Sequence, residues 1–534
     1  QWIAWRTKLP GILLLLIIGI VLGQFIRPDA LLADLVNGDK ATTGPKILFP
    51  RVSMAVAIIM FEGGLSLKFS ELREAGSPAL RLCTIGAAIT AITTTAAAHL
   101  CFGFSWRLSA LLGAILVVTG PTVIGPLLQQ VQPKRRVANT LKWEGIVIDP
   151  IGAVLAVLVF EILLLEPEKL EFGHGFLLLG WTVTVGVVLG IVGGLLLSEG
   201  IRRYLIPDHL HGTGSLAVVL LLFAISNSLA HESGLITVTV LGIFLTNQKG
   251  FDIEHVVEFQ EHLRTLLIGC LFIVLGSDVD ISMIRQVGWS GLLFVVLLVL
   301  IVRPVSVFVS LLGSGLNLRE QSFIASLAPR GIVAAAVSSI FAMKIDQTPE
   351  IDLIGADQLV VITFIVIIGT VTIYGLLASK IARALGLSEP NRNGVLIAGA
   401  DPWVIQFGLV LEKSGCPVLM IDTNYGKITQ AKLAGLEGIC ANIMNEHARE
   451  ELPLSGVGHM MAMTSNDEVN SLAVRECRSM FGRANTYQLT FDSESRRRMT
   501  RNLMGRELFE AGFTHARFEE LIRQGFEFKT TALS

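Results

Sequence analysis

Long apolar stretches dominate the chain up to residue 388. A bilayer core of about 30 Å needs roughly 20 mostly apolar residues for one α-helix to cross it. Twelve stretches have this character, and the eighth of them is short. Their limits are 9–26, 47–66, 79–101, 108–129, 142–165, 175–198, 213–231, 234–248, 263–281, 289–313, 322–344 and 357–380. The pattern predicts a polytopic α-helical membrane domain over residues 1–388.

Beyond a short polar joint, the hydrophobic pattern changes to alternating strands and helices. We expect strands at 395–398, 417–421, 437–443, 459–463 and 485–491, with a helix at 402–413 that begins with proline, a favoured place for it. Strands that alternate with helices indicate a parallel, doubly wound sheet. We therefore predict a Rossmann-like α/β domain over residues 394–492. Residues 493–534 are predicted to be a charged, helical C-terminal extension.

Composition separates the same two regions. Of the 534 residues, 52% are hydrophobic and only 16% are charged. About 13% of residues 1–388 are charged, against about 23% of residues 389–534, where the second value is ordinary for a soluble domain. The formal net charge of −2, without a basic domain, argues against a nucleic-acid partner. The six cysteines show no paired spacing, so neither a zinc site nor a disulfide framework is indicated.

Loop charges predict the orientation, because Lys and Arg favour the cytoplasmic side of a membrane. One set of loops carries the basic residues Lys134, Arg135, Arg136, Arg202, Arg203, Arg319, Lys380 and Arg383, and the opposite set is acidic. We therefore expect the C-terminal domain and residue 1 to be cytoplasmic, in a multi-pass protein of the cell inner (plasma) membrane. Residues 1–5 are typical of a helix already under way. We expect one further helix before them, and thus thirteen spans in the full protein.

Asp149, at the start of the fifth span, is the main candidate for transport chemistry. Ionisable groups inside a membrane are costly and therefore indicate function. Burial disfavours the charged form of a carboxylate, so that protons can compete with cations for it near neutral pH. This is the property that an ion–proton exchanger needs. The alternative is an interfacial aspartate that stabilises the start of a helix.

Two spans are interrupted by glycine and proline. The fourth span contains Thr-Gly-Pro-Thr at 119–122, and the eleventh contains Ala-Pro-Arg-Gly at 328–331. Non-helical backbone at membrane depth is tolerated where it lines a cavity or is buried in protein. A pair of broken spans in corresponding halves of a transporter indicates its binding site. The broken-helix positions are Gly120, Pro121, Pro329 and Gly331; two unrelated proline kinks are the alternative.

Four further charged residues that lie in the predicted spans have expected roles. Arg330 lies in the second break, and Glu144 is the carboxylate that we expect to pair with it, since Asp149 must stay free to exchange its load. This pair is predicted to be structural. Glu62, in Phe-Glu-Gly-Gly at the end of the second span, is a candidate ion or proton ligand, with an interfacial acid that reaches water as the alternative. Arg303 is expected to make hydrogen bonds between helices.

Four motifs in order resemble the cation–proton antiporter superfamily, nearest its NhaP-type branch. They are Phe-Glu-Gly-Gly-Leu at 61–65, Thr-Gly-Pro-Thr at 119–122, Glu-Gly-Ile-Val-Ile-Asp-Pro at 144–150 and Pro-Arg-Gly-Ile-Val-Ala at 329–334. The resemblance covers about residues 1–388. It implies thirteen helices in inverted repeats with two broken helices, a part that forms a homodimer in the lipid bilayer, and a moving six-helix core.

The resemblance also implies residue roles. Asp149 matches the essential ion- and proton-binding aspartate, Thr119 matches a ligand of the metal cation at the crossing, and Glu144 and Arg330 match the family's ion pair. Gly120 stands where the family often has Asp, Ile148 where it usually has Asn or Asp, and Gly145 where it often has Ser. Backbone carbonyls and water would then complete the site. With one carboxylate, one-for-one electroneutral exchange of Na⁺ or K⁺ for H⁺ is implied.

Residues 394–492 resemble the TrkA-N, or RCK, nucleotide-binding domain. The positions that carry the resemblance are Gly399, Asp422 and Thr464, each after a predicted strand. The dinucleotide fingerprint is degraded, because Asp401 stands where a glycine normally lets the backbone approach the pyrophosphate, and it would repel that group. Asp422 could still accept a ribose hydroxyl. An adenine mononucleotide at these residues, and a domain kept for assembly without a ligand, both remain open.

The sequence thus predicts a secondary active antiporter, not an enzyme, regulated by its cytoplasmic domain. A potassium efflux channel gated by a nucleotide-binding domain is the first alternative, but its one filter-like string, at 370–375, lies in an uninterrupted span. A membrane-tethered dehydrogenase is the second, and the degraded glycine pattern argues against it.

Overall fold

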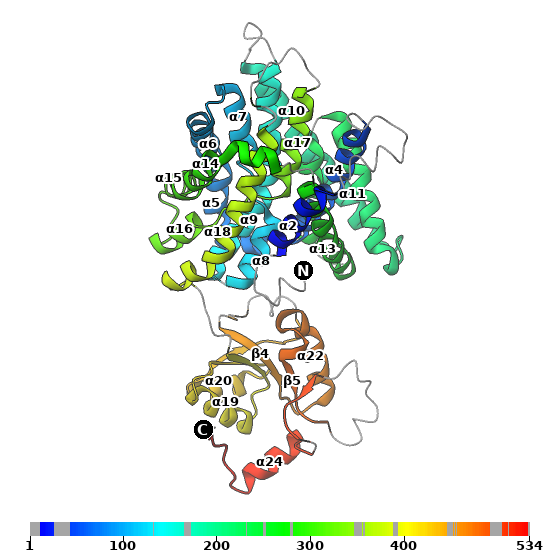
Figure 1. Ribbon diagram of the computed structural model, residues 1–534. Coiled ribbons are helices and arrows are strands. Elements are labelled where there is room, and N and C mark those ends of the chain that lie inside the picture. The colour runs from blue at the N-terminus through cyan, green and yellow to red at the C-terminus, as the bar shows by residue number, and fades with distance from the viewer. Residues whose placement is uncertain are drawn as a thin grey trace. The chain divides into compact units, whose positions relative to one another are not determined.

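The computed structural model divides into two compact units, Gln1–Ser388 and Glu389–Ser534 (Figure 1). The structure describes residues 11–25, 43–131, 133–164, 172–230, 232–248, 253–277, 281–346, 358–387, 393–445, 456–491, 505–510 and 512–531, together with positions 355, 452 and 454. Several acidic loops of the predicted membrane domain, at 26–42 and 165–171, lie outside these residues.

Every predicted span of the first unit coincides with a helix or with a pair of shorter ones. Seven helical stretches are long and apolar enough to cross a membrane, among the residues described. One group of helices packs together: α2 (Gly11–Gly23), α4 (Thr43–Leu65), α10 (Phe172–Arg202), α11 (His211–Leu229), α12 (Ser233–Thr246) and α13 (Glu254–Ser277). We call this group the first bundle; α4, α11 and α13 lie together in Figure 1.

The remaining helices form a second bundle. They are α5 (Phe69–Arg81), α6 (Ala87–Phe102), α7 (Trp106–Ile115), α8 (Pro121–Val131), α9 (Arg135–Leu164), α14 (Ile281–Leu297), α15 (Arg303–Ser310), α16 (Leu318–Ala325), α17 (Ile332–Asp346) and α18 (Gln358–Ala384). Single π-helical turns, Leu82–Gly86 and Leu298–Val302, join α5 to α6 and α14 to α15. The two bundles meet where α9 and α17 pack against α4 and its neighbours.

Glycines allow close helix packing in the first bundle. A Cβ atom on Gly64 of α4 would lie 2.5 Å from the Thr239 carbonyl oxygen of α12, and one on Gly19 of α2 would lie 2.5 Å from the Ile273 carbonyl oxygen of α13. Without a hydrophobic driving force between helices in lipid, such close contact is a main source of their association. The first bundle is therefore joined backbone to backbone.

Both predicted interruptions are confirmed. In the fourth span α7 ends at Ile115 and α8 begins at Pro121, and in the eleventh span α16 ends at Ala325 and α17 begins at Ile332. Each break leaves the carbonyls at the end of one short helix and the N–H groups at the start of the next without partners in their own helix. All four of these helix ends lie in the second bundle.

The second unit is a six-stranded parallel sheet in the order β3-β2-β1-β4-β5-β6. The strands are β1 (Gly394–Ala398), β2 (Val418–Asp422), β3 (Glu437–Cys440), β4 (Val457–Ala462), β5 (Thr486–Gln488) and β6 (Arg506–Glu507). This is the strand order of dinucleotide-binding folds, in which ligands bind outside the carboxyl ends of the strands where the order reverses. The prediction of a doubly wound domain is confirmed.

Side chains of alternating strand positions fill the two faces of this sheet. Val395, Ile397 and Met420 pack on one face with α19 (Pro402–Lys413) and α20 (Tyr425–Leu433), while Leu396 and Leu419 pack on the other with α22 (Asp467–Phe481). Helix α19 has the bounds that the sequence predicts.

The C-terminal extension is not purely helical. Arg506–Glu507 forms β6 and pairs with β5, and a helix, α24 (His515–Arg523), follows it. Residues 492–504, which include the first part of the predicted extension, lie outside the described residues. Phe518 of α24 is buried against Trp403 of α19, so the extension contributes to the core of the second unit.

Candidate functional site

The two broken spans cross at a pair of glycines. The backbone N–H of Gly120 donates a hydrogen bond of 2.9 Å to the carbonyl oxygen of Pro329. A Cβ atom on Gly120 would lie 2.6 Å from the Cα of Gly331, closer than real Cβ contacts allow. Position 120, where the family resemblance leads one to expect Asp, therefore has no room for a side chain in this arrangement.

Arg330 caps the end of a broken helix. The buried guanidinium donates from Nη1 to the carbonyl oxygens of Val117 and Val118, both at 3.0 Å. These carbonyls lie just beyond the end of α7, two and three residues after Ile115. The backbone N–H of Arg330 donates to Thr370 Oγ1 on α18 at 3.2 Å. Arg330 thus ties the second break to the first.

Glu144 pairs with Arg303, so the predicted Glu144–Arg330 pair is wrong. Both guanidinium Nη atoms of Arg303 donate to the carboxylate of Glu144, at 2.5 and 2.9 Å, and the two side chains are only 5% and 3% exposed. Arg303 lies at the start of α15, after a π-helical turn in an apolar span. The prediction failed because it took the arginine in the broken segment, whose charge is already used by backbone carbonyls.

Arg303 also binds carbonyl oxygens at the end of a broken helix, as Arg330 does. Its Nη2 also donates to the carbonyl oxygens of Ile324 and Leu327, at 3.3 and 3.1 Å, at the end of α16. In each broken span, an arginine side chain therefore binds backbone carbonyls near the end of the first helix. The sequence did contain a signal for the role of Arg303, because an arginine within an apolar stretch indicates function.

Asp149 faces the crossing and has no hydrogen-bond partner among the residues that the structure describes. It lies on one face of α9 with Gly145 and Gly152, at spacings of four and three residues. A Cβ on Gly145 would lie 3.7 Å from the Cα of Pro121, and one on Gly152 would lie 3.4 Å from the backbone nitrogen of Val118. The Asp149 face of α9 therefore packs along the first break.

Four oxygen atoms in this region are buried and unsatisfied. Within the part of the chain that the structure describes, both carboxylate oxygens of Asp149 and the hydroxyls of Thr119 and Thr122 lack hydrogen-bond partners. Asp149 is only 1% exposed. Buried polar atoms normally have partners, so these unpartnered oxygens are candidates for binding a ligand. Oxygen ligands suit hard cations, and a carboxylate can equally take a proton. Thr122 was missing from the predicted ligands.

Glu62 has a counterion of its own in the first bundle. Arg264 of α13 donates to Glu62 Oε1 at 2.5 Å, and Glu62 is buried rather than open to water. Its alternative interpretation as an interfacial acid that reaches water is therefore wrong. A cation at Glu62 would have to displace a guanidinium, which sets this residue apart from Asp149.

The predicted nucleotide-binding residues lie together at the carboxyl ends of β1, β2 and β4. Gly399 has φ of +114°, and a Cβ there would lie 2.8 Å from the Met463 carbonyl oxygen, so glycine is required. The Asp422 carboxylate accepts hydrogen bonds from the backbone N–H groups of Ala400 and Asn424, at 2.9 and 2.8 Å. The hydroxyl of Thr464 is bonded to Asn470. These side chains hold the loops of the sheet edge.

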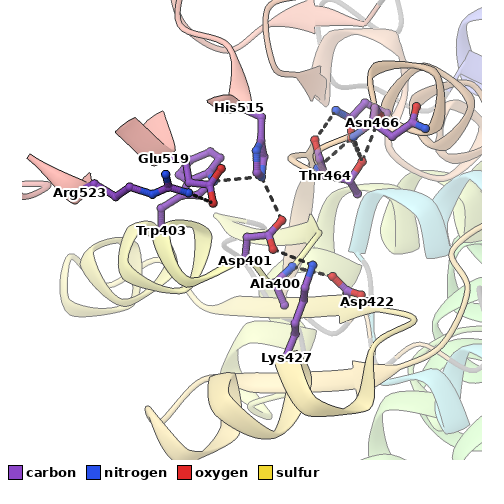
Figure 2. A network of polar contacts seen from close by, with 11 residues as sticks. Ala400, Asp401, Trp403, Asp422, Lys427, Thr464, Asn466, His515, Glu519 and Arg523 are labelled. Carbon is purple, nitrogen blue, oxygen red and sulfur yellow. Dashed lines mark hydrogen bonds and ion pairs between the residues drawn. The ribbon is translucent and has the colours of Figure 1, made fainter. Parts of the chain in front are cut away.

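Asp401, at the start of α19, has two side-chain partners, a lysine and a histidine (Figure 2). Lys427 Nζ on α20 lies 2.6 Å from its Oδ1, and His515 Nε2 on α24 lies 3.0 Å from its Oδ2. Burial is the largest single influence and raises the pKa of Asp401, but the hydrogen bonds and charges of Lys427 and His515 together outweigh it and lower the pKa below its ordinary value. Hydrogen bonding to Asp401 raises the pKa of Lys427.

The chain matches two family models and has relatives of known activity. The model described as sodium/hydrogen exchanger, transmembrane, matches residues 2–384, and the TrkA-N domain model matches residues 395–505. The K(+)/H(+) antiporter NhaP2 of Shewanella baltica is 27% identical over 418 residues, which cover 77% of this chain and 69% of that protein. The Na(+)/H(+) antiporter 1 of Methanocaldococcus jannaschii is 26% identical over 356 residues, 64% of this chain and 80% of that protein.

A solved structure confirms the membrane fold. The sodium proton antiporter MjNhaP1 from Methanocaldococcus jannaschii at pH 8 superposes with a TM-score of 0.63 at 23% identity, over 72% of this chain and 94% of that chain. The match of the first family model extends over most of this chain. The protein is thus a multi-pass membrane protein with a cytoplasmic TrkA-N domain, and it belongs to the sodium/hydrogen exchanger family.

Proposed function

We propose that this protein exchanges a monovalent cation, Na⁺ or K⁺, for H⁺ across the membrane, and that Asp149 alternately carries the two. The observation that carries the proposal is the buried Asp149 carboxylate, which faces the crossing of the broken helices with both oxygens unpartnered. The named activities of the relatives, K(+)/H(+) and Na(+)/H(+) antiport, support the same chemistry.

The proposed mechanism rests on competition at one carboxylate. A cation would bind the Asp149 oxygens together with the hydroxyls of Thr119 and Thr122, and backbone carbonyls and water would complete its shell. A proton on Asp149 removes the negative charge that holds the cation, so a cation and a proton cannot be bound at the same time. One carboxylate then gives one-for-one exchange. Arg303 and Arg330 hold the ends of the broken helices, and Glu144 stays paired with Arg303 throughout.

The two bundles suit different parts of an alternating-access cycle. The first bundle is joined by glycine contacts, and we propose that it forms the fixed part and the homodimer contact in the lipid bilayer. The second bundle contains both breaks and Asp149, and we propose that it moves. Rocking of one bundle against another around a site near the membrane centre is the general way in which such carriers work.

The test is exchange by the full chain in proteoliposomes. We measure cation-dependent proton flux with Na⁺, K⁺ and Li⁺ across pH, for the wild type and for Asp149→Asn. Loss of at least about 100-fold is expected in the variant, because an amide neither ionises nor takes up a proton near neutral pH. The matched control is Asp208→Asn, which alters an exposed carboxylate before α11 and should leave exchange intact.

Two results would contradict the proposal. Full exchange in Asp149→Asn would remove Asp149 from the mechanism. Cation currents without proton coupling in the wild type would favour the gated efflux pathway instead.

We further propose that the cytoplasmic domain regulates exchange. Its edge keeps the required Gly399, but Asp401 fills the start of α19 with a carboxylate already paired to Lys427 and His515. A dinucleotide pyrophosphate would meet that carboxylate, so an adenine mononucleotide near Asp422 and Thr464 is the better candidate ligand. Adding AMP, ATP or NADH to the flux assay tests this; an effect of NADH alone would contradict it.

A further inference from the structure

The C-terminal helix α24 closes over the start of α19. Phe518 stacks on Trp403, with ring centroids 4.8 Å apart and planes at 12°, and it also contacts Phe509 and Phe528. Thr514 caps α24 by accepting from the backbone N–H of Arg517. The next residue, His515, begins the helix and points to the start of α19 (Figure 2). The imidazole of His515 therefore connects the C-terminal extension to the start of α19 at the edge of the sheet.

A single nitrogen of His515 lies within hydrogen-bond distance of two groups that need opposite roles. Its Nε2 lies 3.1 Å from Trp403 Nε1 and 3.0 Å from Asp401 Oδ2. An indole N–H only donates, and an ionised carboxylate only accepts. The nitrogen can accept from Trp403 only when it carries no proton, and it can donate to Asp401 only when it carries one. The two hydrogen bonds therefore exclude each other.

A charged imidazole can have only Asp401 as the partner of Nε2, whereas a neutral one can have either partner, depending on which ring nitrogen carries its hydrogen. An imidazolium carries hydrogens on both ring nitrogens, so its Nε2 must donate to Asp401. A neutral imidazole with its hydrogen on Nδ1 can accept from Trp403 instead. Histidine is the side chain whose charge ordinarily changes between pH 5 and 8. The bond to Asp401 is charge-assisted and hence about twice as strong as the neutral one.

The charged groups around the imidazole come from three helices. Asp401 starts α19, and Lys427 of α20 holds its other oxygen. On α24 itself, Glu519 lies one turn after His515 and is paired with Arg523 at 3.2 Å. Asp422 and Glu519 act on Lys427 at longer range. The carboxylate in contact with His515 is that of Asp401, so a positive charge on the imidazole strengthens the docking of α24.

We propose that His515 makes α24 a proton-sensitive latch. When the imidazole is protonated, its Nε2–H donates to Asp401 and α24 is held tightly on Trp403. When the imidazole is neutral, the charge assistance is lost, Nε2 can accept from the Trp403 N–H instead, and α24 opens more often. The latch would thus respond to cytoplasmic protons, the ion that the membrane domain is proposed to move, but it does not depend on the transport proposal.

The test is hydrogen exchange of the full chain in detergent at pH 6 and pH 8, read by mass spectrometry and corrected for the intrinsic effect of pH. The wild type should protect peptides covering 515–523 about tenfold more at pH 6. His515→Gln keeps a polar side chain that cannot become cationic, and it should show equal protection at both pH values. Asp401→Asn, which removes the charged acceptor, should likewise reduce the difference to less than twofold.

Two further variants separate the latch from general loosening of the domain. Trp403→Phe keeps a ring to stack on Phe518 but removes the N–H, so it should weaken docking at pH 8 more than at pH 6 and widen the difference. His459→Gln, which alters a histidine of β4, should keep the wild-type difference. Equal protection of wild-type α24 at both pH values, or an undiminished difference in both His515→Gln and Asp401→Asn, overturns the proposal.

Discussion

Two carboxylates, one in each unit of the protein, differ in whether they have partners. Asp149, in the membrane, is buried and has no hydrogen-bond partner among the described residues. Asp401, at the sheet edge of the cytoplasmic domain, is held by Lys427 and His515. Asp149 lies within α9, beside the first broken span, and Asp401 lies at the start of α19. The difference teaches that a site is marked less by its backbone than by whether its charged group is already satisfied.

Glu144 extends this comparison to a carboxylate that is both buried and paired, and it should give the largest effect on stability. Replacing Glu144 with Gln leaves the guanidinium of Arg303 inside the membrane without its counterion. We expect a loss of about 3–5 kcal/mol in the free energy of unfolding, because a buried charge without a partner is costly. Thermal unfolding in detergent measures the loss.

The matched control for Glu144 is Glu71, whose pair with Lys142 is partly open to solvent, with exposures of 20% and 29%. Glu71→Gln should cost no more than about 1 kcal/mol. The double variant Glu144→Gln, Arg303→Gln should recover part of the loss of the single one. If Glu144→Gln were as mild as Glu71→Gln, the pair would not have the structural role assigned to it.

Asp401 should give an intermediate effect that depends on pH. Because its pKa is lowered in the folded domain, the ionised form contributes stability above the ordinary value of about 3.9, and this contribution disappears as the pH falls through the lowered folded value. Asp401→Asn should therefore cost about 1 kcal/mol at pH 7, a modest value because Lys427 is 34% exposed. The measurement is urea unfolding of the cytoplasmic domain in the full chain.

The difference in urea midpoint between wild type and Asp401→Asn should shrink as the pH falls from 7 to 3, because the lowered pKa makes the charge contribution fade only in the acidic range. A difference between them that stayed constant from pH 7 to pH 3 would show that the carboxylate charge is not what the two partners stabilise.

Asp149 should give the smallest effect on stability, although its variant should abolish exchange. Asp149→Asn removes a carboxylate that no protein group satisfies, so the free energy of unfolding should fall by less than about 0.5 kcal/mol or should rise. Thermal unfolding beside the flux assay provides the test. A loss as large as that of Glu144→Gln would mean that Asp149 has a structural partner.

The sequence predicts the helices and strands of this protein better than it predicts which charged side chains pair. Apolar length and Gly-Pro breaks gave the spans and both interruptions, because these depend on local backbone chemistry. The partner of Glu144 was missed because Arg303 reaches it from a span 159 positions away, through a helix whose phase is changed by a π-helical turn. His515 and Asp401 are 114 positions apart, and no local pattern indicates their contact.

The arginine caps on the broken helices have an electrical consequence. In the crossing, the opposite charges of Glu144 and Arg303 cancel. The charges that remain are those of Arg330 and Asp149. With either a cation or a proton on Asp149, this group of charges carries the same single positive charge. If the second bundle moves, a membrane potential of 100 mV does about 2.3 kcal/mol of work per full charge displacement on each loaded step, with opposite sign in the two directions. Voltage would then change the rates of the two steps while leaving the balance point of the whole cycle untouched.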